Sequence, residues 1–157
     1  DLVVNSHSFN IGTVRMLNDA VDPVEWDTMR SWLKTNLSDI CAIGIGSGGN
    51  INRLNRLAKK DENRVLKRPK LQQIYKKICS MDLDERINRF RIKPDRAEVI
   101  APAAHIYLQV MKWGNINEIK VPKFGLVDGL IYQQYHNYIN ELSAGDNRTT
   151  GEEADGH

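Results

Sequence analysis

The chain has 157 residues, the length of one compact domain of ordinary size. Apolar residues make up 41% and charged residues 27%, which excludes a disordered, collagen-like or coiled-coil chain. Twenty-two Lys and Arg stand against twenty Asp and Glu, and a net charge of only +2 argues against a protein that holds nucleic acid by bulk charge.

The sequence also limits the compartment and the cysteine chemistry. No apolar run reaches the roughly 18 residues of a membrane span, and the N-terminus lacks a secretory signal, so we expect a soluble, cytoplasmic protein with no membrane partner. Cys41 and Cys79 are too few for a disulfide framework and are expected to be buried thiols. Because the chain begins at Asp1, without Met, inside a strand-like pattern, we interpret it as a piece of a longer protein.

Apolar periodicity and turn residues predict alternating strands and helices in the first part of the chain. Asp22 and Pro23 form a typical helix start, and the continuous apolar run over residues 40–46 is typical of a buried parallel strand. In chain order, the expected elements are a strand over 2–11, a helical turn over 13–17, a helix from Asp22 that ends within 36–39, a strand over 40–46 and a helix over 50–59.

The second part of the chain is predicted to be mostly helical. Residues 59–68 are polar and mostly basic and are expected to form an exposed connection. The expected elements after it are helices over 71–79, 83–90 and 95–113, a strand over 118–122, a helix over 126–142 and a disordered polar tail over 143–157. The alternation favours one α/β domain over residues 1–142 with a partly parallel sheet.

The sharpest motif is the run GIGSGGN over residues 44–50, which lies between a predicted strand and a predicted helix. Its glycines permit a tight turn and let successive N–H groups point outward at a helix N-terminus, which favours an anion such as phosphate. Phosphate or nucleotide binding is one interpretation of this loop. The other is a tight turn in which glycine serves packing alone.

The same loop has the G-x-G-x-x-G spacing of dinucleotide sites at Gly44, Gly46 and Gly49. Such a site expects a second strand that ends in an acidic residue about twenty positions on, whereas residues 63–70 are basic and contain a proline. A nicotinamide or flavin site is therefore the weaker interpretation. A P-loop is excluded because no Gly-Lys-Ser or Gly-Lys-Thr follows the glycines.

Four segments together resemble the second lobe of the exopolyphosphatase/guanosine pentaphosphate phosphatase family, within the actin, Hsp70 and sugar kinase fold group. They are FNIGTVR over 9–15, GIGSGGN over 44–50, KPDRAEVIAP over 93–102 and FGLVDGLI over 124–131, and they occur in the family's order. The resemblance implies an actin-like (ribonuclease H-like) lobe, with a mixed sheet flanked by helices and the lobe's N-terminal strand missing.

The resemblance also implies an activity for the parent protein. It would be a bacterial hydrolase that removes terminal phosphate from inorganic polyphosphate or guanosine pentaphosphate, with magnesium, in a cleft between two lobes. The family's first lobe carries a phosphate loop and a glutamate that activates the attacking water, and neither is expected in this chain. We therefore expect no catalytic residue and no metal here, and no activity without the missing N-terminal lobe.

The resemblance and the loop chemistry together nominate phosphate-binding residues. Arginine suits a phosphate chain because its planar guanidinium makes two charge-assisted hydrogen bonds at once. Surface or ion-paired arginines are the alternative interpretation for both candidates. The nominated residues are Gly46, Ser47, Gly48, Gly49, Asn50, Arg96 and Arg15.

Other polar residues favour structural roles. His7, His105 and His136 lack the spacing of metal ligands, and His105 is expected to be a satisfied core residue on an apolar helix. A cation site at Asp82, Asp84 and Glu85 competes with a capping cluster at a helix start, and capping is favoured.

Two further hypotheses remain open. The chain has Asn50 where the resembled family commonly has Thr, which leaves a non-catalytic regulatory module that binds nucleotides or polyanions as the alternative to an enzyme part. If the strand over residues 2–11 has lost its neighbour, its open edge is expected to pair with a second copy as a homodimer.

Overall fold

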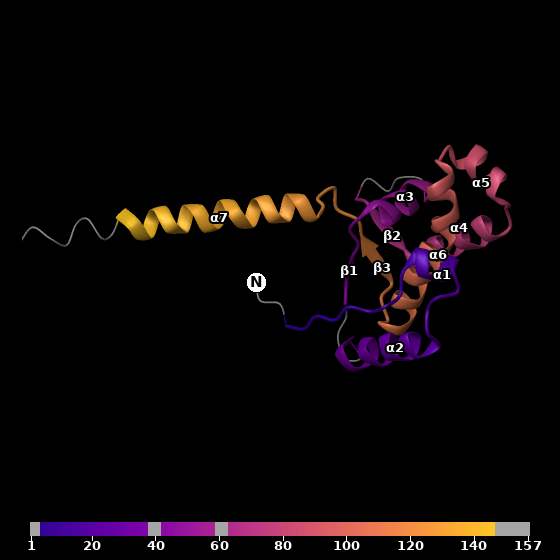
Figure 1. Cartoon of the computed structure of the whole chain (residues 1–157), viewed down its shortest axis with the longest axis horizontal. Coiled ribbons are helices and arrows are strands. Elements are labelled where there is room, and N and C mark those ends of the chain that lie inside the picture. The colour runs from indigo at the N-terminus through magenta and orange to yellow at the C-terminus, as the bar shows by residue number, and fades with distance from the viewer. Residues whose placement is uncertain (1–3, 38–41, 59–62, 147–157) are drawn as a thin grey trace, which may run out of the picture. The chain divides into compact units, whose positions relative to one another are not determined.

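The computed structural model describes residues 4–37, 42–58 and 63–146 (Figure 1). The chain divides into two compact units, residues 1–122 and residues 123–157. Among the described residues, no helix is long and apolar enough to cross a bilayer.

The first unit contains a small mixed sheet. Its strands are β1 (Gly44–Ile45), β2 (Val65–Lys67) and β3 (Glu118–Lys120), in the spatial order β1-β3-β2. β1 runs parallel to β3, with Gly44 opposite Ile119, and β2 runs antiparallel to β3. The predicted mixed α/β fold is confirmed.

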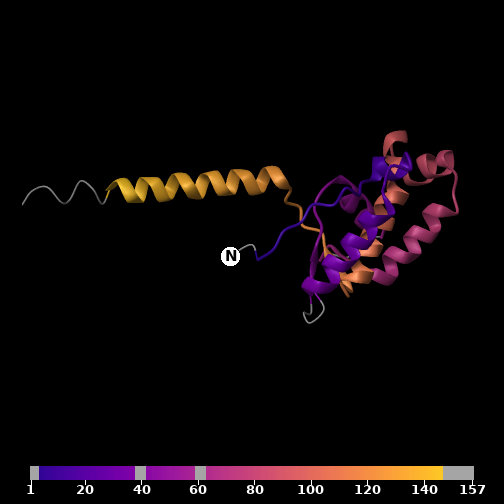
Figure 2. The same cartoon turned by 60° about the horizontal axis from the view of Figure 1, so that its bottom comes forward.

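Helix α6 lies at the centre of this unit, and the other helices of the unit contact it. Both views show α6 flanked by these helices (Figures 1 and 2). The helices are α1 (Thr13–Leu17), α2 (Pro23–Leu37), α3 (Gly49–Leu57), α4 (Arg68–Cys79), α5 (Leu83–Phe90) and α6 (Pro94–Trp113). Their positions confirm the predicted helices of this unit within a few residues at each end.

The core fills the space between α3, α4, α6 and the sheet. These elements supply apolar side chains at helical or alternating spacing, and burial of such side chains is the main favourable term in folding. The largest fully buried side chains are Ile51, Leu54, Leu66, Leu71, Ile78, Ile100, Met111 and Val121.

The strand predicted over residues 2–11 is wrong for its described part. Residues 4–11 form no strand, because no described strand lies beside them to complete the backbone hydrogen bonds that a sheet requires. Instead, Asn10 N–H donates to a carboxylate oxygen of Glu25 at 3.0 Å, and the Phe9 ring packs edge-on against Trp32. The edge strands of the described sheet are instead β1 and β2. The homodimer stays a prediction.

The predictions for two other segments also need correction. The strand predicted over 40–46 is reduced to β1 among its described residues, since only Gly44 and Ile45 pair with β3. Residues 59–68, predicted to be an exposed connection, contain β2, which forms because buried Leu66 lies opposite Ile119 in the core. Residues 40, 41 and 59–62 lie outside the described residues.

The cysteine prediction is wrong for Cys79, which is exposed at the end of α4. Cys41 lies outside the described residues.

The second unit consists of α7 (Leu126–Asp146) in its described part. The Gly125 N–H donates to the Asp128 carboxylate at 2.7 Å just before the helix. The predicted helix over 126–142 is confirmed and extends to Asp146, so the predicted tail is wrong at its start, where the helical hydrogen bonding continues. Residues 147–157 lie outside the described residues.

Candidate functional site

The glycine loop divides into a packed half and an open half. In the packed half, a Cβ placed on Gly46 would lie 2.8 Å from Ile51 Cγ1 and 2.9 Å from Ile119 Cγ2. A Cβ on Gly44 would lie 3.0 Å from Ile119 Cγ1. Gly46 also donates its N–H to the carbonyl of Lys120 at 2.8 Å. These two glycines therefore let α3 and the sheet approach closely, which is the packing role.

The open half of the loop starts α3. Gly48 is the N-cap residue with φ of 105°, a conformation that favours glycine, and a Cβ there would meet nothing within 4 Å. No side chain caps the helix at this residue. Because Gly48 has no side chain to accept from the first N–H groups of α3, these groups and the positive end of the helix dipole favour an anion.

A cavity of about 200 Å³ opens along one side of α3, from its first residue to its last turn. We call it the α3 pocket. It is lined by Gly49, Asn50, Arg53, Arg56, Arg96 and Ile100. Its lining contains three guanidinium groups and no carboxylate, so its charge is positive.

Arg96 reaches the pocket from α6. Its Nη1 atom lies 3.4 Å from the place where a Cβ on Gly49 would be, so the guanidinium lies against the helix start. The Arg96 Nε atom lies 3.7 Å from a carboxylate oxygen of Asp95, and both side chains are more than half exposed. Such an exposed ion pair contributes little free energy, so it leaves Arg96 available to an anion.

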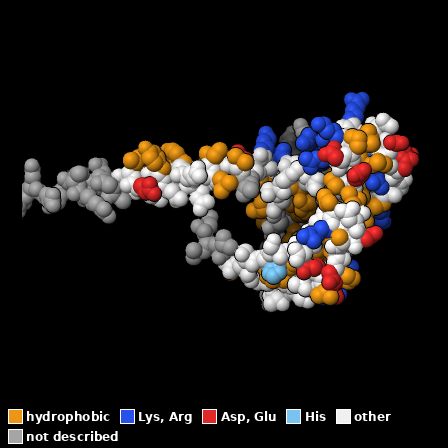
Figure 3. All heavy atoms as spheres, in the orientation of Figure 1, with side chains coloured by type: hydrophobic (Ala, Val, Ile, Leu, Met, Phe, Trp, Pro, Cys, Tyr) orange, Lys and Arg blue, Asp and Glu red, His pale blue; other side chains and the backbone are white. Residues whose placement is uncertain are grey.

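Arg53 and Arg56 were missed by the sequence reasoning, which assigned only the apolar face of this helix. They follow Gly49 at steps of four and three residues, so they share one side of α3. That spacing was the signal that could have found them. Figure 3 shows Lys and Arg side chains gathered over α3.

The structure brings some of the nominated residues together and leaves others apart. Gly49, Asn50 and Arg96 line the α3 pocket, and Gly48 precedes Gly49 as the N-cap of α3. Gly46, in the packed half of the loop, is buried. Ser47 is exposed but does not line the pocket, and Arg15 is exposed on α1, also outside the lining.

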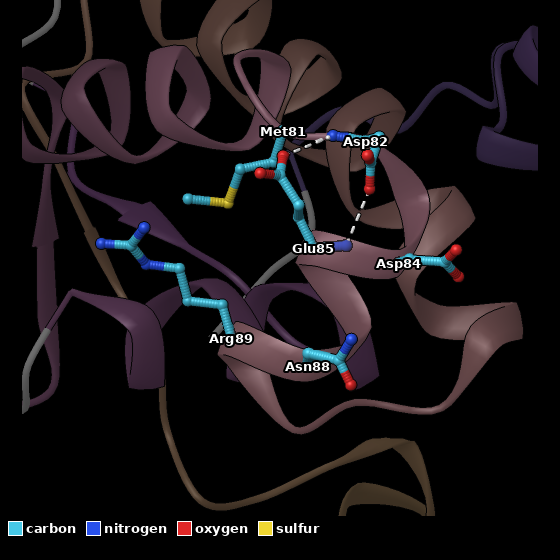
Figure 4. Close-up of a pocket in the computed structure, with 6 residues that line it drawn as sticks. All are labelled: Met81, Asp82, Asp84, Glu85, Asn88 and Arg89. Carbon is cyan, nitrogen blue, oxygen red and sulfur yellow. Dashed lines mark hydrogen bonds between the residues drawn. The ribbon is translucent and has the colours of Figure 1, made fainter.

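The acidic cluster at α5 is a helix cap. Asp82 accepts a hydrogen bond from the Glu85 N–H at 2.8 Å, and the Glu85 carboxylate accepts from the Asp82 N–H at 3.0 Å (Figure 4). This reciprocal pair is a capping box, as the favoured interpretation predicted. Asp84 points away from the other two carboxylates in Figure 4. Among the described residues, no group of three or more His, Cys, Asp or Glu is placed to hold a metal ion.

His105 lies half-buried on α6, away from the α3 pocket lining. Its Nε2 faces Gln109 Nε2 at 3.3 Å and its Nδ1 faces the Tyr75 hydroxyl at 3.4 Å. Each ring nitrogen therefore lies beside a polar side chain with which it can exchange a hydrogen bond. Burial lowers the pKa of His105 below its usual 6.5, since the imidazolium loses hydration. His105 is thus a satisfied structural residue, as predicted.

The fold and the pocket define the class of protein. A mixed sheet flanked by helices, whose parallel strand leads through a glycine turn into a helix start, is an α/β lobe with an anion-favouring loop. The Ppx/GppA phosphatase family model matches residues 3–138. The chain belongs to the Ppx/GppA phosphatase family. No curated protein sequence matches it.

Solved structures of this family share the fold. An exopolyphosphatase from Cytophaga hutchinsonii superposes with a TM-score of 0.67 at 18% identity, over 87% of this chain and 51% of that chain. A PPX-GPPA enzyme from Aquifex aeolicus gives a TM-score of 0.63 at 23% identity, over 83% of this chain and 49% of that chain. The chain therefore has the actin-like lobe fold and spans about half the length of these relatives.

Proposed function

We propose that this chain is the phosphate-binding lobe of an exopolyphosphatase-type hydrolase. In the whole protein, the α3 pocket would face the cleft between two lobes and hold the terminal phosphates of inorganic polyphosphate or guanosine pentaphosphate. Family membership supports the hydrolase class. The proposal includes both candidate substrates.

One observation carries the proposal: three arginines line one pocket along α3, Arg96 lies against the helix start, and the pocket lining has no carboxylate. Each guanidinium presents a planar fork of N–H donors that matches two oxygens of a phosphate group. The N–H groups of the helix start add fixed donors whose direction is set by the backbone. The pocket can thus orient a phosphate and stabilise its negative charge.

The pocket contains no group that could take a proton from water, since its polar side chains are one amide and three guanidinium groups. Phosphoryl transfer depends mainly on positioning and on charge stabilisation, which this lobe would supply. The residue that activates the attacking water would lie in the other half of the protein.

The magnesium ion implied by the family resemblance does not fit the described part of this chain. Mg²⁺ prefers carboxylate oxygens and water, whereas the pocket is lined by cationic groups and the described residues include no suitable acidic or histidine cluster. We therefore assign its ligands to the other half and derive no step through it.

Calorimetric titration with inorganic tripolyphosphate tests the pocket. The wild-type chain is expected to bind, and Arg96→Gln is expected to weaken binding about tenfold, because a hydrogen bond to a charged group contributes roughly 1.5–3 kcal/mol. The dependence of affinity on salt should become shallower, since one cation fewer is neutralised.

The matched control is Arg30→Gln, which removes one exposed arginine from α2, outside the pocket. It should leave the affinity within twofold of wild type. Equal losses in the two variants would mean that tripolyphosphate responds only to net charge, and absence of wild-type binding would overturn the proposal.

A further inference from the structure

Arg64 lies in the segment between α3 and β2 with a backbone that an arginine seldom adopts. Its φ is 52°, in the left-handed region that costs free energy for any residue with a side chain. Such a conformation persists only where surrounding bonds determine it. At Arg64 the bonds are present: the Val121 N–H donates to its carbonyl at 2.9 Å, and its own Nε donates to the Val121 carbonyl at 2.6 Å.

The same guanidinium reaches α3. Arg64 Nη2 donates to Asn52 Oδ1 at 2.6 Å, so one side chain bridges the end of β3 and the first part of α3. The nitrogen of the same amide, Asn52 Nδ2, donates to the Gly48 carbonyl at 2.8 Å. That carbonyl also accepts the backbone N–H of Asn52 at 3.2 Å. A continuous chain of hydrogen bonds thus runs from Val121 through Arg64 and Asn52 to Gly48.

The direction of the Gly48 carbonyl fixes the direction of the next N–H. In a trans peptide unit the C=O and the following N–H are coplanar and point in opposite directions. The Gly48 carbonyl is held toward α3, so the Gly49 N–H points away from the helix, at the end where Gly49 lines the α3 pocket. Two adjacent glycines place little steric restriction on rotation of this peptide unit, so the Asn52 side-chain amide adds a second restraint to that of the helical bond from the Asn52 backbone N–H.

We propose that Arg64 is a positioning residue for the α3 pocket, which acts through Asn52 to aim the Gly49 N–H at a bound phosphate. The inference rests on the proposed phosphate-binding function of that pocket. Arg64 is not among the residues that line the pocket, so it contributes no direct contact with an anion there.

Arg91 provides a matched control. It is also an arginine with φ of 50°, but it is the C-cap of α5, where a left-handed residue is common at a helix end. Arg91→Gln and Arg64→Gln each remove one positive charge from a left-handed residue, whereas only Arg64→Gln interrupts the bonds that lead to Gly48. Asn52→Ala interrupts the same bonds without a change of charge.

The first experiment needs no ligand. In ¹H–¹⁵N NMR spectra of the full chain, Arg64→Gln and Asn52→Ala are both expected to shift the Gly48 and Gly49 amide signals and to speed exchange of the Gly49 amide hydrogen. Arg91→Gln should leave these signals in place. Unchanged Gly48 and Gly49 signals in Asn52→Ala would overturn the inference. Should Arg64→Gln fail to fold, Asn52→Ala carries the test alone.

The second experiment measures tripolyphosphate affinity by calorimetry. Asn52→Ala should weaken tripolyphosphate binding about fivefold. Because Arg64 and Asn52 act through one chain of hydrogen bonds, Arg64→Gln in the Asn52→Ala background should cause no greater further loss of affinity than Arg91→Gln causes. Fully additive losses at Arg64 and Asn52 would overturn it. If wild type does not bind, the proposed function fails, while the spectra without ligand still decide the positioning role.

Discussion

Gly46 has no room for a side chain, because a Cβ there would lie within 3 Å of both Ile51 and Ile119. Both isoleucines are buried, so neither can move without disturbing the core. We expect Gly46→Ala to lower the free energy of unfolding by about 1–3 kcal/mol, the usual cost of an added methyl group in a packed interior. Urea unfolding followed by circular dichroism measures this difference.

Gly12 is the control for that substitution. A Cβ at Gly12 would meet nothing within 4 Å, and its φ of −155° is accessible to alanine. Gly12→Ala should therefore change the free energy of unfolding by less than about 0.5 kcal/mol. A similar loss in both variants would show that Gly46 is not confined by its neighbours.

His105 makes stability depend on pH. Its pKa in the folded chain lies below the usual 6.5 because burial disfavours the imidazolium, so the unfolded chain binds a proton first as pH falls. The stability that neutral His105 contributes is therefore present above pH 6.5 and is lost as pH falls from there through the folded pKa. His105→Gln should show a smaller loss of unfolding free energy between pH 7.5 and pH 5 than wild type does. The same slope in His105→Gln as in wild type would contradict the assigned burial effect.

At the scale of the element, α5 depends on its capping box. Asp82→Ala removes the acceptor for the Glu85 N–H, and loss of such a cap typically costs about 1 kcal/mol of stability. Thermal unfolding should report a lower midpoint for Asp82→Ala and a nearly unchanged one for Asp84→Ala. A rise in the wild-type midpoint on addition of Mg²⁺ that disappears in Asp82→Ala would instead indicate a cation site.

Helices could be predicted from the sequence because each is specified by its own residues: apolar spacing, Pro at the start and a capping box are local signals. Strands could not be predicted to the same degree, because a strand exists only where a neighbour accepts its hydrogen bonds. Residues 4–11 have a strand-like composition but no neighbour among the described strands, whereas the polar segment with β2 lies beside β3.

The candidate site, too, could be predicted only in part from the sequence. The glycine run located the turn before α3, since glycine spacing is visible in the sequence. The sequence could not show that Gly46 permits close packing whereas Gly48 starts α3. That difference depends on how closely Ile119, in a strand distant along the chain, approaches Gly46. The place of Arg64 in the hydrogen-bond chain likewise required the fold to bring Val121 beside it.

At the scale of the whole molecule, the chain spans about half the length of its solved relatives. The α3 pocket lining supplies cations and one amide, with no carboxylate to activate water. The purified chain should therefore release no phosphate from tripolyphosphate with Mg²⁺ above the protein-free background, as a colorimetric phosphate assay would show. Release that scales with protein concentration and disappears in Arg96→Gln would contradict this expectation.

The tryptophans lie on only two helices, α2 and α6. Trp26 and Trp32 lie on α2 and Trp113 ends α6, and these are the three tryptophans of the sequence. The Trp26 ring lies 6.1 Å from the Trp113 ring and 5.5 Å from the His105 ring, while the α3 pocket has no tryptophan in its lining. Intrinsic fluorescence therefore monitors the packing of α2 on α6, and a change in emission on adding an anion would mean that binding at α3 is transmitted across the core.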